Sequence, residues 1–191
     1  DLDGATAVLT GAGSGIGRAA AVAFAARGAR IVASDINAER AEETAEFVRA
    51  AGGQAIGVRV DVSQQSDLED LRDRALAEFG QIDVVMNNVG VLAMGPAESL
   101  PIEAWQRVLD LNLLSVARSN LVFLPLLIEQ GHGAADLRGG NVRAAQLLRN
   151  RSHFAGGNAL HIHLGQGQAQ STFTAQSFFQ GFGVEPALAH L

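Results

Sequence analysis

The sequence of 191 residues contains no cysteine, no tyrosine and no lysine, so all fourteen basic residues are arginine. Without cysteine the chain forms no disulfide and has no thiolate chemistry, which is compatible with a cytoplasmic protein. The length suffices for a single core of one sheet covered by helices on both sides.

The sequence also lacks a long apolar run and a basic cluster. Its longest unbroken apolar run, Leu121 to Ile128, is too short to span a bilayer, and no charged segment followed by an apolar one opens the chain. Residues 1–131 carry eighteen acids and ten arginines, whereas residues 132–191 carry two acids and four arginines. We therefore expect a cytoplasmic protein that binds neither nucleic acid nor a membrane.

What the sequence does contain is a glycine-rich segment that follows the apolar run Ala5 to Leu9. Apolar residues then recur at helical spacing from Ile16 to Phe24, which predicts a strand, a tight turn and a helix. Glycine lets the backbone approach a pyrophosphate, and the start of the helix offers N–H groups to an anion. The alternative is a glycine turn that binds nothing. The predicted phosphate-binding residues are Gly11, Ser14, Gly15, Ile16 and Gly17.

A carboxylate ends the second predicted strand, Arg30 to Ser34. Asp35 lies 18 residues after Gly17, close to the place where a dinucleotide fold positions an acid against the adenosine ribose. The same carboxylate would repel a 2′-phosphate, and no arginine follows it directly. We predict that Asp35 and the adjacent Ile36 bind the adenosine half, and that NAD is preferred over NADP. The alternative for Asp35 alone is a solvated acid in a turn.

Further elements follow from periodicity and turn residues. Helices are expected from about Gly15 to Arg27, from Ala38 to Ala51, after Ser66 and from about Pro101. Ser66 and Glu69 have the form of a capping box. Strands are expected at Gln54 to Val60 and at Ile82 to Met86.

The pattern Thr-Gly-x-x-x-Gly-x-Gly, which begins at Thr10, resembles the NAD(P)-binding loop of the short-chain dehydrogenase/reductase family. Three later motifs of that family match in order: an acid and an apolar residue after the third strand, Asn-Asn-Ala-Gly with valine for alanine, and Asp-x-Asn-Leu. The resemblance implies cofactor contacts by Asp61, Val62, Asn88 and Gly90, and a catalytic role for Asn112 in holding a water that relays protons. The alternatives are a strand-end turn for Asp61 and Val62, and for Asn112 an amide that satisfies backbone groups at a helix break.

The resemblance implies an α/β fold, a Rossmann-type doubly wound parallel sheet with strand order 3-2-1-4 and an atypical or incomplete C-terminal part. It also implies NAD-dependent oxidation of a small-molecule alcohol or reduction of a carbonyl, and a homo-oligomer. In the family mechanism a tyrosine moves the proton at the substrate oxygen, and a lysine lowers its pKa and binds the nicotinamide ribose. Because both residues are missing, we predict that this chain is inactive by that mechanism. The alternative is a non-catalytic NAD-binding or dimerisation module.

The resemblance ends near Gly133. We expect residues 1–133 to form the NAD-binding region and 134–191 not to form a separate domain, because the Tyr-x-x-x-Lys helix is absent there. Three interpretations stay open: a divergent half in which Ala159 to Leu164 is the fifth strand, a frameshifted or alternatively spliced end, and a misassigned sequence. No metal site is predicted, because His161 and His163 have no third ligand at a suitable spacing. A sheet without its later strands would also fold poorly.

Overall fold

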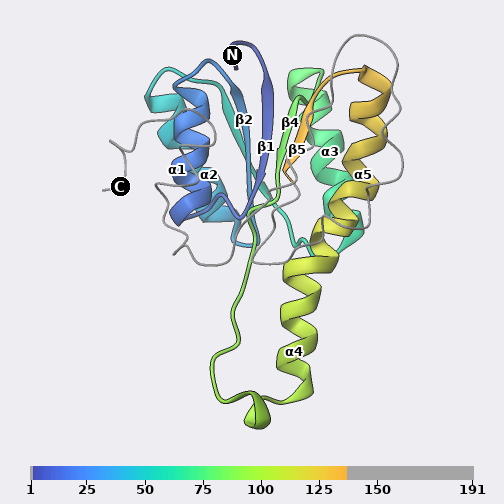
Figure 1. Ribbon diagram of the computed structural model, residues 1–191. Helices are drawn as coiled ribbons and strands as arrows, with labels where there is room; N and C mark the ends of the chain where they lie inside the picture. Colours follow the sequence, from blue (N-terminus) through green and yellow to red (C-terminus); the bar gives the residue numbers. More distant parts are fainter. Residues whose placement is uncertain (1, 137–191) are drawn as a thin grey trace, which may run out of the picture.

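The computed structural model describes residues 2–136, and its centre is a five-stranded parallel sheet with the order β3-β2-β1-β4-β5. Figure 1 shows the strands with their carboxyl ends directed to the same edge of the sheet. The strands are β1 (Thr6–Thr10), β2 (Arg30–Asp35), β3 (Ala55–Arg59), β4 (Val84–Met86) and β5 (Ala134–Asp136).

Helices cover both faces of this sheet, with α1 and α2 on one face and α3 and α5 on the other (Figure 1). Side chains alternate along β1, so that Ala7 and Leu9 join the first core while Val8 joins the second. Every residue of β1 is buried, as expected for a central parallel strand covered on both faces. The helices are α1 (Gly15–Ala25), α2 (Ala38–Ala50), α3 (Gln65–Phe79), α4 (Ile102–Leu109) and α5 (Ser115–Gln130), with short turns η1 (Ala97–Ser99) and η2 (Asp110–Leu114).

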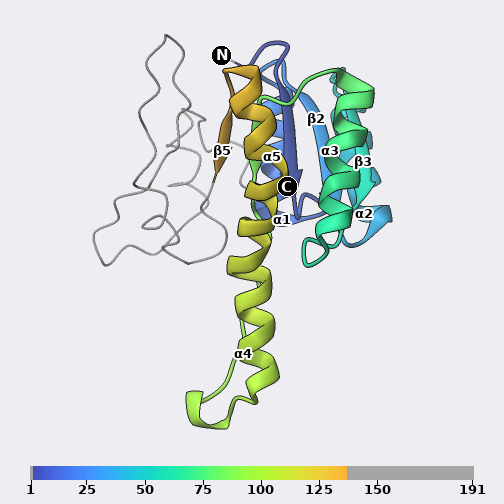
Figure 2. The ribbon, with the colours of Figure 1, turned by 90° about the vertical axis from the view of Figure 1, so that its right-hand side faces the viewer.

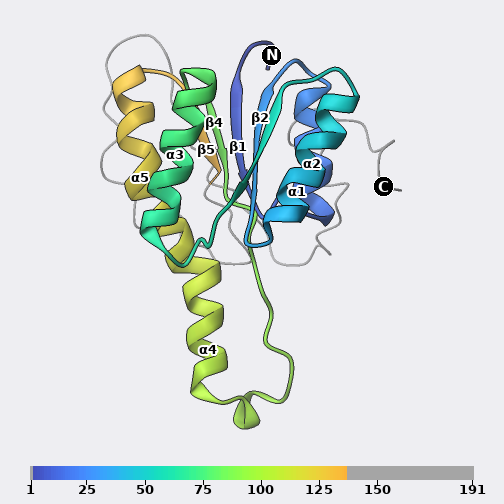
Figure 3. The ribbon, with the colours of Figure 1, turned by 180° about the vertical axis from the view of Figure 1, so that it is seen from behind.

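The long helical segment from α4 to α5 determines the shape of the molecule. The α4 end and the loop that precedes it extend beyond the carboxyl edge of the sheet, whereas α5 packs beside α3 (Figures 2 and 3). By length and composition alone, residues Ile102–Gln130 could cross a membrane. The apolar composition is accounted for in part by packing, since Val122, Phe123 and Leu127 are buried in the second core.

The expected α/β fold and the strand order 3-2-1-4 are confirmed, and β5 extends the sheet beyond residue 133. The residues directly after Gly133 do not predict this strand, because Ala-Ala-Asp is too short and too weakly apolar. The other candidate for a fifth strand, Ala159 to Leu164, lies outside the described residues. The capping box was wrong: α3 begins at Gln65 with Gln64 as its N-cap, and no side chain makes a cap hydrogen bond.

Candidate dinucleotide-binding site

A cavity of about 420 Å³ lies at the carboxyl edge of the sheet, where β1, β2, β3 and β4 end. Crevices outside the carboxyl ends of parallel strands are the usual ligand sites of open α/β sheets. Ten of the eleven residues predicted to bind the cofactor line this one cavity: Gly11, Ser14, Gly15, Ile16, Asp35, Ile36, Asp61, Val62, Asn88 and Gly90.

The eleventh residue, Gly17, lies behind the loop and has a packing role. A Cβ atom at Gly17 would lie 2.2 Å from the carbonyl oxygen of Gly11 and 2.7 Å from the Asn88 side chain. A Cβ atom at Gly15 would meet no atom within 4 Å, and its φ of +52° favours glycine. Gly17 therefore allows close packing of helix and loop, whereas Gly15 faces open space in the cavity.

The start of α1 is suited to bind an anion. The Ser14 N-cap makes no side-chain cap hydrogen bond, and the first turn of α1 contains no acidic residue. Because the first N–H groups of a helix have no intrahelical acceptor, they are available to a phosphate oxygen. The donor set of this end of the cavity therefore fits a pyrophosphate.

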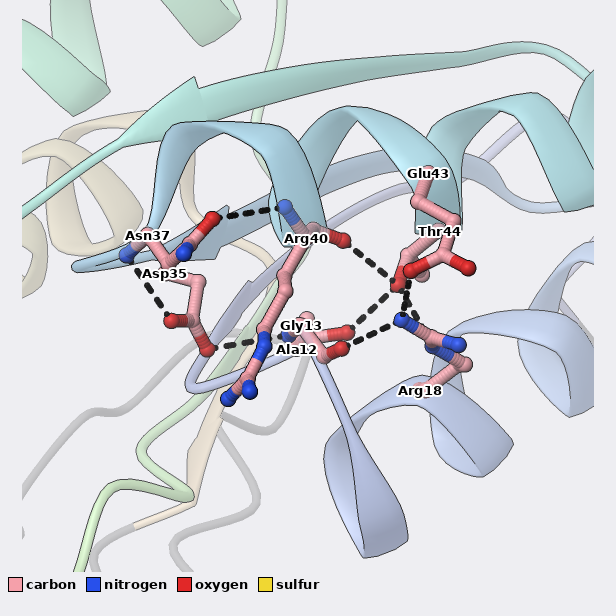
Figure 4. A network of polar contacts seen from close by, with 8 residues as sticks. All are labelled: Ala12, Gly13, Arg18, Asp35, Asn37, Arg40, Glu43 and Thr44. Atoms are coloured by element: carbon pink, nitrogen blue, oxygen red, sulfur yellow. Dashed lines mark hydrogen bonds and ion pairs between the residues drawn. The ribbon is translucent and has the colours of Figure 1, made fainter.

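Asp35 connects the glycine loop to the start of α2. Its Oδ2 atom accepts the N–H of Gly13 at 3.0 Å, and its Oδ1 atom accepts the N–H of Asn37 at 3.0 Å (Figure 4). Asn37 in turn caps α2 by accepting the N–H of Arg40. The carboxylate is therefore held at the end of β2 with part of its surface facing the cavity.

Arg18, which the sequence analysis did not single out, joins the glycine loop to α2. Its Nε atom donates to Thr44 at 3.0 Å, and its Nη2 atom donates to the Gly13 carbonyl and pairs with Glu43 at 2.6 Å (Figure 4). Thr44 donates to the Ala12 carbonyl at 2.8 Å. Two consecutive carbonyls of the loop are thus fixed, that of Ala12 by Thr44 of α2 and that of Gly13 by Arg18 of α1. The only sequence signal for this contact was an arginine directly after the glycine motif.

Asn88 fixes the other side of the loop. Its backbone N–H donates to the Thr10 hydroxyl at 3.1 Å, and its side-chain Nδ2 donates to the Gly11 carbonyl at 3.1 Å. The segment after β4 is thereby tied to the segment after β1, and Val89 and Gly90 line the cavity beside it. The valine that replaces the usual alanine would come within 3.0 Å of a Cβ atom at Gly11.

Asn112 is buried in the π-helical turn η2, at the junction of α4 and α5. Its Oδ1 atom accepts the N–H of Val91 at 2.8 Å and its Nδ2 atom donates to the Val91 carbonyl at 2.8 Å. The side-chain amide therefore holds the loop after β4 through both backbone groups of Val91. It does not satisfy backbone groups at a helix break, because the helical segment continues through η2. The role of Asn112 in holding a water stays a prediction.

At the far end of the cavity, Asp61 accepts the N–H of Ser63 at 2.9 Å, and its own N–H donates to Asp67 of α3 at 2.9 Å. Arg107 and Leu111 complete the lining from the α4 side. Sequence reasoning did not predict these two residues, although Leu111 directly precedes Asn112 in its motif. No group of three or more His, Asp or Glu residues within residues 2–136 is arranged to hold a metal, and His161 and His163 lie outside that range.

Comparison with known proteins agrees with this geometry. The family described as short chain dehydrogenase matches residues 5–135. The chain belongs to the short-chain dehydrogenase family.

Two relatives illustrate the range of the family. The chain is 33% identical to the 7alpha-hydroxysteroid dehydrogenase of Escherichia coli (strain K12) over 163 residues, which are 85% of this chain and 63% of that protein. It is 40% identical to the D-threitol dehydrogenase of Mycolicibacterium smegmatis over 133 residues, 70% of this chain and 51% of that protein. This short-chain dehydrogenase sequence thus spans between half and two thirds of the length of these curated relatives.

Two solved structures show the same fold. A 7 alpha-hydroxysteroid dehydrogenase complexed with NADH and 7-oxo glycochenodeoxycholic acid matches with a TM-score of 0.67 and 35% identity, over 70% of this chain and 52% of that one. A short-chain dehydrogenase/reductase from Burkholderia phymatum in complex with NAD matches with a TM-score of 0.68 and 38% identity, over 70% of this chain and 48% of that one. Both relatives were solved with a nicotinamide dinucleotide bound.

Proposed function

We propose that this short-chain dehydrogenase binds NAD(H) in the cavity at the carboxyl edge of its sheet. The observation that carries the proposal is the assembly of ten separately predicted residues around one cavity. The start of α1 would hold the pyrophosphate, and Asp35 would bind the hydroxyls of the adenosine ribose. Asp61 and Val62 would contact the adenine end.

We propose that NAD is preferred over NADP. The Asp35 carboxylate is held by two backbone N–H groups, and no arginine side chain pairs with it among residues 2–136. A 2′-phosphate at the ribose would therefore be repelled by the carboxylate of Asp35.

The family chemistry is oxidation of an alcohol or reduction of the matching carbonyl. Its relatives include enzymes named for hydroxysteroids, D-threitol and cyclohexanol, so we propose a secondary alcohol or ketone as the substrate class of the whole protein. The bound cofactor supplies hydride acceptance or donation. Within these 191 residues, however, no phenol and no lysine ammonium is present to move the proton at the substrate oxygen. We propose that this chain binds the cofactor without turnover by the family mechanism.

The test combines two measurements on the same preparation. The first is a titration of NADH fluorescence, and the second is the oxidation of cyclohexanol, D-threitol and a hydroxysteroid by NAD⁺, followed as the formation of NADH. We expect saturable binding without turnover. Absence of saturable binding would contradict the proposed site. Turnover at the rate of an ordinary dehydrogenase would contradict the second proposal and leave the first intact.

A homo-oligomer is a further proposal, supported by the exposed apolar residues of the long helical segment. Leu114, Leu121 and Ile128 follow one another at seven-residue spacing and are 46%, 69% and 47% exposed. Such a row suits packing against a second helix. We also expect the protein to act in the cytoplasm, with residues 1–133 as the NAD-binding region.

A further inference from the structure

Arg107 stands out because it is the only basic residue among the described side chains that line the dinucleotide cavity. Its side chain is exposed, and its guanidinium has no hydrogen bond or ion pair with any other residue in the range 2–136. The nearest acid on the following helical turn, Asp110, is already paired with Arg118 at 2.6 Å. Arg107 is therefore available to a ligand.

The position of Arg107 places it at the adenosine end of the cavity. It also lines an adjoining cavity of about 580 Å³, and the residues shared by the two cavities are Ile36, Asp61, Arg107 and Leu111. Ile36 and Asp61 follow β2 and β3, on the side of β1 that is opposite to β4. The glycine loop and the start of α1 line only the dinucleotide cavity and not the adjoining one.

The chemistry of this shared region suits a purine. Ile36 is 62% exposed and Leu111 is half-buried, so two aliphatic side chains are open to an uncharged flat group. A guanidinium is planar and weakly hydrated, and it stacks on aromatic rings more readily than an ammonium does. A base inserted there would be covered by side chains that come from β2 and from α4.

We propose that Arg107 stacks its guanidinium on the adenine ring of the bound dinucleotide and thereby links α4 to cofactor binding. This inference rests on the proposed NAD(H) site. It assigns a binding role to α4, the helix that extends beyond the carboxyl edge of the sheet (Figure 1). The glycine motif and the acids at the strand ends assign no binding role to this helix. Arg107 is a binding residue in this account and has no role in hydride or proton transfer.

The test measures the affinity of the whole chain for NADH by fluorescence, and for adenosine and reduced nicotinamide mononucleotide by competition. Arg107→Ala should weaken the affinities for NADH and adenosine about fivefold and leave that for the mononucleotide unchanged. Arg107→Lys should recover less than half of the loss, because an ammonium lacks the planar surface. Arg74→Ala, which removes an exposed arginine of α3 outside the cavity, is the charge-matched control and should change nothing.

The outcomes separate this inference from the proposed function. If the wild-type chain binds NADH and Arg107→Ala leaves adenosine affinity within twofold, the adenine contact is overturned while the site stands. If Arg107→Ala weakens NADH but not adenosine, the guanidinium acts on another part of the cofactor and the stacking is overturned. If the wild type binds neither NADH nor adenosine, the proposed site itself fails.

Discussion

At the scale of single residues, the account depends on Asp35. Its carboxylate is the group expected to select the ribose diol, and its two oxygens already accept N–H groups from Gly13 and Asn37. In Figure 4 the Arg40 side chain lies beside this carboxylate. The arrangement predicts that removing the negative charge changes both the strength and the preference of cofactor binding.

For Asp35→Ser we predict an affinity for NADH about tenfold lower, because charge-assisted hydrogen bonds to the ribose are lost. Affinity for NADPH should rise relative to NADH, since the repulsion disappears and Arg40 can then meet the 2′-phosphate. Fluorescence titrations with both nucleotides measure the ratio. Equal weakening for NADH and NADPH would contradict the role of Asp35 in selection.

Gly15 and Gly17 are predicted to have different roles, and parallel substitutions separate them. Gly17→Ala would force a Cβ atom against the Gly11 carbonyl and should destabilise the fold by about 3 kcal/mol. Gly15→Ala has open space around its new Cβ, so only its left-handed φ of +52° opposes it, at a cost of about 1 kcal/mol, and it should lose NADH affinity because the methyl group enters the cavity. Thermal unfolding and NADH titration distinguish the two. A reversed pattern would refute this division of roles.

Sequence reasoning performed well at the residue scale where one chemical motif determines one position. Gly15 and Asp35 both line the cavity, because a phosphate turn and a strand-end acid have few alternatives, and their contacts to the cofactor stay predictions. Arg18 and Arg107 were missed because an arginine on a helix has no local signal of its partner, and both acquire their environment from segments distant in sequence.

At the scale of elements, Thr44 of α2 supports the glycine loop directly, and Arg18 of α1 links the loop to α2. These contacts touch two carbonyls of the loop and leave its N–H groups open to the cavity. Arg18 is not among the residues that line the cavity, so we propose that it acts as a positioning residue that orients the loop.

For Arg18→Ala we predict an NADH affinity about fivefold lower, because the Gly13 carbonyl loses its donor and the loop gains freedom. Arg18→Lys should restore part of the affinity, since an ammonium can reach one of the three partners. Arg72→Ala, which removes an exposed pair with Asp73, is the matched control. Unfolding temperatures should accompany the titrations, and an Arg18→Ala protein with normal affinity would contradict the positioning role.

Element ends were harder to predict than element identities. The start of α3 was placed at a capping box that does not form, because Ser66 lies inside the helix and Glu69 instead accepts the side-chain amide of Gln65. A helix break at Asn112 was one of the two interpretations of this residue, and the structure shows instead a π-helical turn in one long helical segment. A buried amide that binds Val91 on both sides stabilises that turn, and no local pattern in the sequence reveals a partner 21 residues away.

At the scale of the whole molecule, the sheet order followed from the sequence because two βαβ units on either side of β1 permit few topologies. The fifth strand could not be predicted from the sequence. Its three residues form a strand because they hydrogen-bond to β4, and their own sequence shows no strand pattern. The exposed row formed by Leu114 of η2 and by Leu121 and Ile128 of α5 is relevant to the oligomeric state.

We predict that the chain self-associates through this row and that Leu121→Glu shifts it toward the monomer. A carboxylate in the middle of an apolar interface would have to lose its hydration. The free energy of that desolvation exceeds the free energy gained by burying an exposed leucine. Light scattering coupled to size exclusion measures the mass. Ser66→Glu offers a control, since it adds the same charge at an exposed position of α3, away from the row. A wild-type chain that is monomeric at all concentrations would contradict the prediction.

The most direct test of the central claim is a crystal structure of this chain with NADH. The account predicts the pyrophosphate oxygens within hydrogen-bond distance of the N–H groups at the start of α1, and the adenosine ribose hydroxyls on the carboxylate of Asp35. A dinucleotide bound away from that cavity, or a ribose that does not contact Asp35, would contradict it.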